Sequence, residues 1–585
     1  MPRLSFVLAV HREQAHLEEC AESILAFADS ELVAIDDASP DHAPELLDAI
    51  AGRDARVRVT HLTERAGFGA ARNLGLEQAT GDYVWFVRTT DLVASPDRVA
   101  AALEDGPDVL VVRHETRSML GKVRPGAADD ARLFDKVFRR AFLRDIGARF
   151  GPAGASELTV TWPAMLRAER VKALDEVAYV RRRFGNAVRE PRPTTDVLAQ
   201  YRRVLSHAPR ARVMGRALRD VAPERPSRPR RPRRRPKLDP DLAVFAAYWY
   251  SGYACNPRAI YEKARELVPG FRGVWVVKPD AVATIPPGVE HVVARTPEYH
   301  DVLRRATYFV NNVNFPNHLV KRPGTLHVMT HHGTPLKRMG LDERRAAGQG
   351  LVKDFSALLR RCRRWDYSVA QNAFTTLYFE RVYPLDYETL EVGYPRNDML
   401  ATATPEDVAR AREQLRLQPG QRAILYAPTY REYDHDAVPV EDVTRLAETL
   451  PEDHVLLMRL HSFSGRDVQP GRVVDAAHAR VEDACLAADA LITDYSSIMF
   501  DYAVLDRPIV IHAPDWDTYR EMRGTTFDIT AEPPGAVSRS ADEVADAFAS
   551  GAAWDATDRR AAFRERFCSL EDGGAAERVV RAVWR

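Results

Sequence analysis

The chain has 585 residues, 45% of them hydrophobic and 28% charged, which is an ordinary composition for a soluble globular protein. At roughly 150 residues per domain, this length predicts about three or four domains and excludes a single hydrophobic core. Lysine plus arginine and aspartate plus glutamate both number 83. The net charge therefore excludes attraction of the whole molecule to an anionic partner, which would have to bind a local patch.

Cysteine usage and hydropathy both predict a cytoplasmic protein. The five cysteines are far apart, include no CxxC pair and have no histidines near them at metal-ligand spacing, so we expect reduced thiols. The first apolar run, Leu4–Val10, is too short for a signal peptide and is followed at once by polar residues. No stretch of the sequence approaches the roughly 20 apolar residues that span a bilayer.

The first 200 residues alternate short apolar strands with amphipathic helices. Strands are predicted at Leu4–Val10, Glu31–Ile35 and Tyr83–Val87, and a helix at His16–Ala28. This alternation predicts an α/β domain with parallel strands over residues 1–200. Two of the strands run into the polar segments DDASPD and RTTD, at the sheet edge where open α/β sheets place ligands. The candidate ligand-binding residues there are Asp36, Asp37 and Asp91.

Residues 201–237 are predicted to be a linker. Their last part, ERPSRPRRPRRRPK at 224–237, contains eight arginines and lysines and is interrupted by prolines, so it can neither bury a face nor form a helix. Such a cluster could bind an anionic membrane surface, at about 1 kcal/mol per basic residue. It could also be a spacer stiffened by proline, or bind nucleic acid nonspecifically. We favour the membrane surface and expect no nucleic-acid partner.

After the linker, the alternation restarts in two blocks of similar size, residues 238–400 and 401–585. Gly273–Val277 and Leu326–Thr330 are strand candidates in the first block, and Ala423–Tyr426 and Ala490–Thr493 in the second. Two α/β blocks that face each other across a cleft would place their connecting loops around a shared ligand. We therefore expect the functional site of this half in the loops that follow the strands.

One such loop contains a candidate general base. Residues 325–340, TLHVMTHHGTPLKRMG, are predicted to form a buried strand that ends in a loop containing His332, Gly333, Thr334 and Lys337. A histidine at this place can accept a proton near neutral pH, and a general base contributes roughly 10²–10⁴-fold to rate. A loop histidine taken alone is more often structural, so the neighbouring motifs decide between these interpretations.

Three further strand ends carry arginine, histidine or hydroxyl side chains. The candidates are Thr429 and Arg431, then Arg459 and His461, then Asp494, Ser496 and Ser497. Serines at a helix start bring hydroxyls and free backbone N–H groups to the positive end of the helix dipole, which suits phosphate, although an ordinary helix cap has the same pattern. Together, these side chains suit a pyrophosphate better than a neutral ligand.

Several motifs in this half resemble those of the CDP-glycerol glycerophosphotransferases, the teichoic-acid polymerase family. They are HHGTPLK, GYPRND at 393–398, YAPTYRE, RLH and TDYSSIMFDYAVLDRPIV, and the resemblance covers about 240–540. It implies a GT-B-like fold of two Rossmann-type domains and a donor that is CDP-glycerol or another CDP-polyol such as CDP-ribitol. The acceptor would be a lipid-linked polyol-phosphate polymer, which places the enzyme on the inner face of the cell membrane.

The same resemblance assigns roles to individual residues. His332 matches the family's proposed base, and His461 is a second catalytic candidate. Arg431, His461, Ser496 and Ser497 match positions that line the donor's phosphates, and we add Thr429, Arg459 and Asp494 to that group. Gly333, Thr334 and Lys337 are expected on the acceptor side. No cofactor is firmly predicted, a divalent cation such as Mg²⁺ or Mn²⁺ is possible, and the oligomeric state is not predicted.

Residues 3–91, and more weakly the chain to about 185, resemble the family-two glycosyltransferases of GT-A fold. The segments that carry the resemblance are DDASPD, which in that family holds the nucleotide, and GAARNLGLEQATGDYVWFV. Where the family has Asp-Ser-Asp-Asp, this chain has Arg88-Thr89-Thr90-Asp91, so the carboxylates that hold a divalent cation are largely absent. Leu158 stands at the expected base position. We predict a degenerate domain; the alternatives are a second, sugar-transferring activity and a noncatalytic docking or glycan-binding module.

Overall fold

The computed structural model describes residues 3–125, 132–151, 157–185, 236–346, 354–429, 431, 446–459 and 472–585. The chain divides into two compact units, residues 1–231 with 384–386 and residues 232–383 with 387–585, and each is described by itself. Most of the predicted linker, including nearly all of its arginine-rich part, lies outside the described residues, as does His461.

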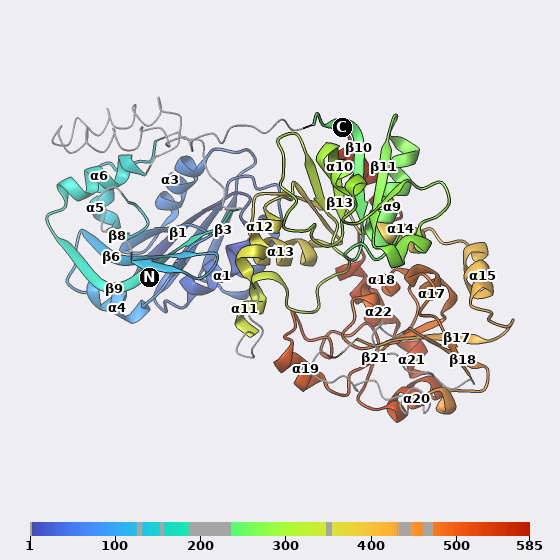
Figure 1. Ribbon diagram of the computed structural model, residues 1–585. Helices are drawn as coiled ribbons and strands as arrows, with labels where there is room; N and C mark the ends of the chain where they lie inside the picture. Colours follow the sequence, from blue (N-terminus) through green and yellow to red (C-terminus); the bar gives the residue numbers. More distant parts are fainter. Residues whose placement is uncertain are drawn as a thin grey trace. The chain divides into compact units, whose positions relative to one another are not determined.

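The described residues of the first unit form a mixed sheet with helices against it (Figure 1), in the strand order β3-β2-β1-β4-β8-β6-β9-β5, with β7 paired to β6. The strands are β1 (Leu4–Val10), β2 (Ser30–Asp36), β3 (Val57–His61), β4 (Tyr83–Val87), β5 (Leu92–Val93), β6 (Val109–Ser118), β7 (Val123–Pro125), β8 (Lys136–Arg139) and β9 (Val171–Arg183). The helices are α1 (Gln14–Leu25), α2 (Ala43–Arg53), α3 (Phe68–Gln78), α4 (Pro96–Leu103), α5 (Arg140–Asp145) and α6 (Leu158–Arg167).

Central strands of this sheet are apolar runs buried on both faces. Every residue of β1 and β4 is buried, as expected for parallel strands covered by helices on both sides. Strands β1 to β4 pair in parallel, as predicted. By contrast, β8 runs antiparallel to β4 and β6. A hairpin from β6 to β7 precedes β8, and a hairpin reverses the chain, whereas a parallel neighbour needs a crossover.

The described residues of the second unit form two parallel sheets. The first has the order β12-β11-β10-β13-β14-β15-β16 and the second the order β19-β18-β17-β20-β21-β22. The first contains β10 (Asp239–Ala246), β11 (Arg272–Val277), β12 (His291–Val293), β13 (Ala306–Asn311), β14 (Leu326–Met329), β15 (Tyr367–Ala370) and β16 (Glu388–Glu391). The second contains β17 (Arg422–Ala427), β18 (His454–Met458), β19 (Val473–Asp475), β20 (Ala490–Thr493), β21 (Ile509–His512) and β22 (Ala536–Ser538).

Both sheets follow the doubly wound order, in which the third, second and first strands lie on one side and the fourth and later strands on the other. Ligands bind such sheets outside the carboxyl ends of the strands, next to the point where the order reverses. That point lies between β10 and β13 in one sheet and between β17 and β20 in the other. A ligand is therefore expected at the loops that follow β10 and β13, with the neighbouring β14, and at those that follow β17 and β20.

Helices cover both sheets of this unit (Figure 1). They are α9 (Cys255–Leu267), α10 (Pro297–Arg305), α11 (Glu343–Ala346), α12 (Phe355–Cys362), α13 (Ala373–Val382), α14 (Asp398–Ala401), α15 (Pro405–Gln414), α17 (Val481–Ala487), α18 (Ile498–Tyr502), α19 (Trp516–Met522), α20 (Ala541–Ala549), α21 (Ala552–Asp555), α22 (Thr557–Phe567) and α23 (Ala575–Val583). Among the described helices, none combines the length and the hydrophobicity that a bilayer crossing needs.

The last helix, α23, returns to the first sheet of this unit. Val579, Val580 and Val583 belong to the same buried cluster as Phe245 and Trp275 of β10 and β11. Burial of each such side chain contributes about 1.5–3 kcal/mol. The C-terminal residues therefore connect the second half of the unit to the first.

Candidate functional site

The two histidines that follow β14 have different surroundings. The ring of His331 stacks on Phe379 with 3.9 Å between centroids, and its Nε2 lies 3.0 Å from the hydroxyl of Ser368, all in the core. The ring of His332 is half-buried and lies 5.8 Å from the ring of Tyr248. His331 therefore positions the loop, and His332 is the histidine that can meet a substrate.

Positive charge surrounds His332. Burial, together with the nearby cations Arg396 and Lys337, lowers the pKa of His332 from 6.5 to about 4. The imidazole is therefore neutral near pH 7 and can accept a proton. The same cations would attract an anionic substrate to the histidine.

Gly333 brings this loop against the other half of the unit. A Cβ atom on Gly333 would lie 2.5 Å from Oγ and 2.7 Å from Cβ of Ser497, too close for any side chain. The carbonyl of Gly333 accepts a hydrogen bond of 3.2 Å from the Tyr394 hydroxyl. The loop after β14 and the start of α18, predicted from separate motifs, are thus in contact.

Thr334 and Lys337 hold the loop in place. The buried Thr334 hydroxyl donates to Oε1 of Gln371 at 2.5 Å and accepts from Asn372 at 3.3 Å. Lys337 pairs through its backbone with Thr525, and its ammonium lies 5.9 Å from the ring centroid of Tyr519. Thr334 is thus a buried polar residue, while Lys337 is half-buried and close enough to His332 to lower the pKa of its imidazole.

Arg431 is bound between two carboxylates at the point where the order of the second sheet reverses. Its Nη1 donates to Asp494 at 2.5 Å, and its Nε and Nη2 donate to Asp515 at 2.8 and 2.9 Å. Asp494 also accepts the backbone N–H of Thr429 with both oxygens, at 2.8 and 2.9 Å. Because these carboxylates hold three of its nitrogens, Arg431 would reach a phosphate only by exchanging a partner.

The other predicted phosphate ligands differ in what they contact. Ser496 accepts the backbone N–H of Ile498 at 3.4 Å, and Ser497 precedes α18, which has only five residues. Arg459 donates from Nη1 to the carbonyls of Ala476 and Ala479 at 2.8 and 2.6 Å, which holds the segment after β19. The two serines are half-buried and could still bind a ligand, whereas the Arg459 guanidinium is already hydrogen-bonded to backbone carbonyls.

Arg396 and Asn256 are site residues that the sequence analysis did not single out. Nδ2 of Asn256 donates to the carbonyls of Thr330 and His331 at 3.0 and 3.1 Å, and its Oδ1 accepts the backbone N–H of Arg396 at 3.1 Å. The Arg396 guanidinium donates to Asp501 of α18 at 2.5 Å, with both side chains buried. The only sign of Arg396 in the sequence was its place within the GYPRND motif.

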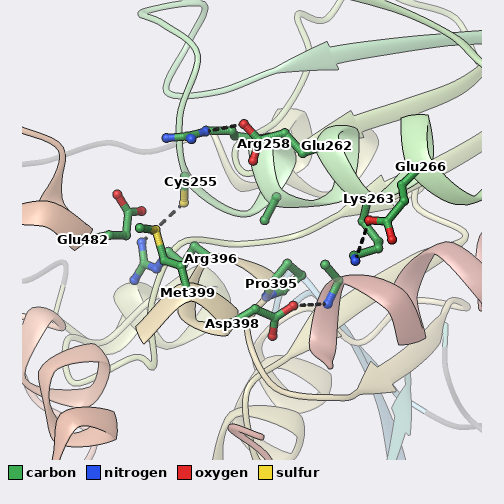
Figure 2. A pocket seen from close by; sticks show the side chains of 12 residues that line it. Cys255, Arg258, Glu262, Lys263, Glu266, Pro395, Arg396, Asp398, Met399 and Glu482 are labelled. Carbon is green, nitrogen blue, oxygen red and sulfur yellow. Dashed lines mark hydrogen bonds and ion pairs between the residues drawn. The ribbon is translucent and has the colours of Figure 1, made fainter. Parts of the chain in front are cut away.

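Arg396 also lines a pocket of about 290 Å³ (Figure 2). Figure 2 shows one face of α9 along its wall, with Arg258 paired to Glu262 at 2.8 Å. Nη1 of Arg396 lies 3.3 Å from the Cys255 sulfur in this wall. The wall also includes Glu482, at the start of α17. Arg396 thus lies between this pocket and the histidine loop.

In the first unit, the predicted nucleotide-binding carboxylates are bound by the chain itself. Asp37 is fully buried and accepts the backbone N–H groups of Ala66 and Gly67 at 2.6 and 2.9 Å. Asp36 accepts the backbone N–H of Ser39 at 3.0 Å and lies 3.0 Å from Nδ1 of His61. These two carboxylates shape the loop and present little surface to a ligand.

Asp91 and Arg88 do not form a site for a divalent cation. Asp91 is fully buried and accepts from the Tyr179 hydroxyl at 2.6 Å, the Arg182 backbone at 2.9 Å and Arg88 Nε at 3.1 Å. Arg88 lies 4.6 Å from the ring centroid of Phe134, where its charge would repel a metal ion. Among the described residues, no group of three or more His, Cys, Asp or Glu could hold a metal. The residues present therefore do not fit the cation of family-two glycosyltransferases.

Two doubly wound sheets with polar loops in contact define residues 236–585 as a GT-B-like pair of Rossmann-type domains. Residues 229–585 match the family described as CDP-Glycerol:Poly(glycerophosphate) glycerophosphotransferase, and the chain belongs to this family. Residues 5–153 match Glycosyl transferase family 2.

Curated relatives and a solved structure cover the same half. The chain is 31% identical over 364 residues to the teichoic acid poly(glycerol phosphate) polymerase of Bacillus subtilis, covering 58% of this chain and 48% of that one. It is 31% identical over 373 residues to the teichoic acid glycerol-phosphate transferase of Staphylococcus aureus, covering 59% and 93%. The chain thus spans about half the length of the first relative. A structure of the wall teichoic acid polymerase TagF is 29% identical, with a TM-score of 0.54 over 59% of this chain and 89% of that one.

Proposed function

We propose that the second unit transfers glycerol phosphate from CDP-glycerol to the terminal hydroxyl of a lipid-linked polyol-phosphate polymer, releasing CMP. Family membership and the names of the relatives support this activity. The observation that carries it is the contact between Gly333 and Ser497, which places a neutral His332 beside the serine-bearing start of α18. The proposed base for the acceptor would then be next to the hydroxyls proposed to bind the donor's phosphates.

In the proposed reaction, His332 takes the proton of the acceptor hydroxyl while that oxygen bonds to the β-phosphorus. The bond from the β-phosphorus to the oxygen bridging the phosphates breaks, and CMP leaves with that oxygen. Catalysis of phosphoryl transfer rests on positioning and on charge stabilisation. Ser496, Ser497 and His461 would line the phosphates, and Arg396 and Lys337 would offset their negative charge.

The low pKa of His332 is consistent with its proposed role as the proton acceptor. In the free enzyme, burial and the neighbouring cations keep the imidazole neutral and ready to accept a proton. A bound diphosphate would offset those cations and raise the pKa towards neutrality, which strengthens the base when the acceptor is present. We assign Arg431 to holding Asp494 and, through it, the Thr429 backbone.

The donor's polyol separates the proposal from its main alternative. Residues that hold phosphate say little about the length of the carbon chain, so CDP-ribitol remains the alternative donor. The experiment is CMP release by the full chain from equal concentrations of each donor, with a lipid-linked glycerol-phosphate acceptor. We expect CDP-glycerol to be used at least tenfold more efficiently in kcat/KM. Release only from CDP-ribitol would contradict the proposal.

We also propose that the arginine-rich segment at 224–237 holds the enzyme to anionic lipid. Eight basic residues at about 1 kcal/mol each near the surface would suffice for binding that salt weakens. The measurement is co-sedimentation of the full chain with vesicles of neutral lipid, or of neutral lipid plus phosphatidylglycerol. Equal binding to both kinds of vesicle would rule out the electrostatic attachment.

For the first unit, we propose a noncatalytic binding module, because its carboxylates are bound internally. The alternative is a second activity that transfers a sugar. Incubation of the full chain with UDP-sugars and Mn²⁺ distinguishes the two, and metal-dependent UDP release would establish the alternative.

A further inference from the structure

The loop after β10 has an unusual backbone. Tyr248, Trp249 and Tyr250 follow one another in the left-handed region, with φ angles of +44°, +54° and +73°. Bulky L-residues rarely adopt this conformation even singly, because the Cβ atom crowds the following carbonyl. Strained backbone persists where the surroundings enforce it, and it is concentrated at functional sites.

The rest of the first sheet holds this turn firmly. The backbone N–H of Tyr248 donates to Oδ1 of Asn312 at 2.9 Å, and the carbonyl of Tyr250 accepts the backbone N–H of Lys278 at 2.8 Å. Tyr250 is buried, with its hydroxyl 3.3 Å from that of Tyr299. These contacts fix the turn, so the strain is part of a rigid arrangement.

The turn directs its two tyrosines inwards and its tryptophan outwards. The ring of Tyr248 lies 5.8 Å from His332, whereas Trp249 is 65% exposed. All eight tryptophans of the chain lie among the described residues, and the other seven are buried or half-buried. The molecule thus presents its one well-exposed indole on the residue next to the tyrosine that contacts the base.

We infer that Trp249 binds the polyol-phosphate chain of the acceptor next to its reacting hydroxyl. This inference rests on the proposed function, in which His332 contacts the acceptor. Trp249 and His332 both follow strands of the first sheet, whereas the predicted phosphate-binding serines follow a strand of the second. A side chain at this edge of the first sheet, one residue from the tyrosine that lies near His332, is therefore on the acceptor side rather than the donor side.

The chemistry of an indole fits this ligand. A polyol-phosphate chain alternates carbon segments with charged, hydrogen-bonding groups. The indole offers an apolar face for the C–H groups and an N–H that donates to a phosphate or hydroxyl oxygen. Trp249 would hold the end of the chain in register with His332, which makes it a binding and specificity-determining residue.

Fluorescence tests the inference without any donor. Full chain is titrated with glycerol-phosphate oligomer, and tryptophan emission is followed for wild type, Trp249→Phe and, as a matched control, Trp554→Phe at a half-buried tryptophan. We expect a saturable change in wild type and Trp554→Phe that is lost in Trp249→Phe. No change in wild type, or the same change in Trp249→Phe, would overturn the inference.

Kinetics provide the second readout. In Trp249→Ala, we expect the KM for the acceptor to rise at least tenfold while the KM for CDP-glycerol stays within twofold, because the side chain contacts one substrate only. An unchanged acceptor KM in an enzyme that releases CMP would sink the inference and leave the proposed function intact. A wild-type chain that shows the Trp249-dependent emission change yet releases no CMP would contradict the proposed function instead.

Discussion

Gly333 lies so close to Ser497 that a methyl group in place of its hydrogen would be 2.5 Å from the serine oxygen. The two residues come from different sheets and are 164 positions apart in the sequence. Their contact fixes the distance between the candidate base and the candidate phosphate-binding turn. Geometry of this kind matters, because a misplacement of about 1 Å can cost roughly 10²-fold in rate.

The first prediction concerns this contact. Gly333→Ala should lower kcat for CMP release by about 10²-fold and destabilise the second unit by about 1–3 kcal/mol through overpacking. In the double variant, Ser497→Gly should restore part of the lost stability, because it removes the clashing atoms. It should not restore kcat, because it also removes a proposed phosphate ligand. Rates and urea unfolding of the two single variants and the double variant measure this, and strictly additive effects on the free energy of unfolding would contradict a direct contact.

The second prediction concerns pH. kcat/KM reports the ionisation of the free enzyme, so its acidic limb should fall near pH 4 rather than near 6.5. Lys337→Met should move this limb upward, because one of the cations that lower the pKa of His332 is removed. The depressed pKa also predicts that stability due to His332 is complete above pH 6.5 and lost as the pH falls through 4. A limb near 6.5 in wild type would contradict the account of the base's surroundings.

The third prediction concerns the buried pair of Arg396 and Asp501. Asp501→Asn leaves the Arg396 charge buried without its carboxylate and should destabilise the second unit by about 3–5 kcal/mol in urea unfolding. The exposed pair of Arg272 and Glu290 provides the control, since Glu290→Gln should cost at most about 1 kcal/mol. Equal effects of the two substitutions would show that Arg396 is not buried as described.

The fourth prediction concerns metal binding by the first unit. Because Asp91 is saturated by Arg88, Tyr179 and the Arg182 backbone, Mn²⁺ should not raise the melting temperature of the full chain, with or without UDP. Asp91→Asn should destabilise this unit by about 1–3 kcal/mol, because buried donors lose a charged acceptor. Thermal unfolding with Mn²⁺ and with EDTA measures the first effect, and a stabilisation that requires Mn²⁺ would contradict it.

Much of the fold could be predicted because buried strands leave a local signal. Leu4–Val10, Tyr83–Val87 and Ala490–Thr493 are apolar runs in the sequence, and the structure has β1, β4 and β20 at these bounds. Local signals do not determine the direction of a strand within its sheet. The antiparallel β8 shows this, because its direction depends on pairing with β4 and β6.

The position of a candidate site residue could be predicted where it depends only on the end of a strand. It could not be predicted where it depends on a partner far away in the sequence. His332 lies in the loop after β14 and is half-buried, as expected from its position at the end of a buried strand. The carboxylates around Arg431 come from Asp494 and Asp515, more than 60 residues away, so its pairing could not be predicted. The same holds for Arg396, whose carboxylate partner lies 105 positions further along the chain.

The most direct test of the central claim is the rate of CMP release from CDP-glycerol by His332→Ala, with a lipid-linked glycerol-phosphate acceptor. His291→Ala, at an exposed histidine on β12, is the control for a lost imidazole. With His332 as the base, kcat should fall by about 10²–10⁴-fold in His332→Ala and stay near wild type in His291→Ala. Near wild-type release by His332→Ala would show that another group takes the proton.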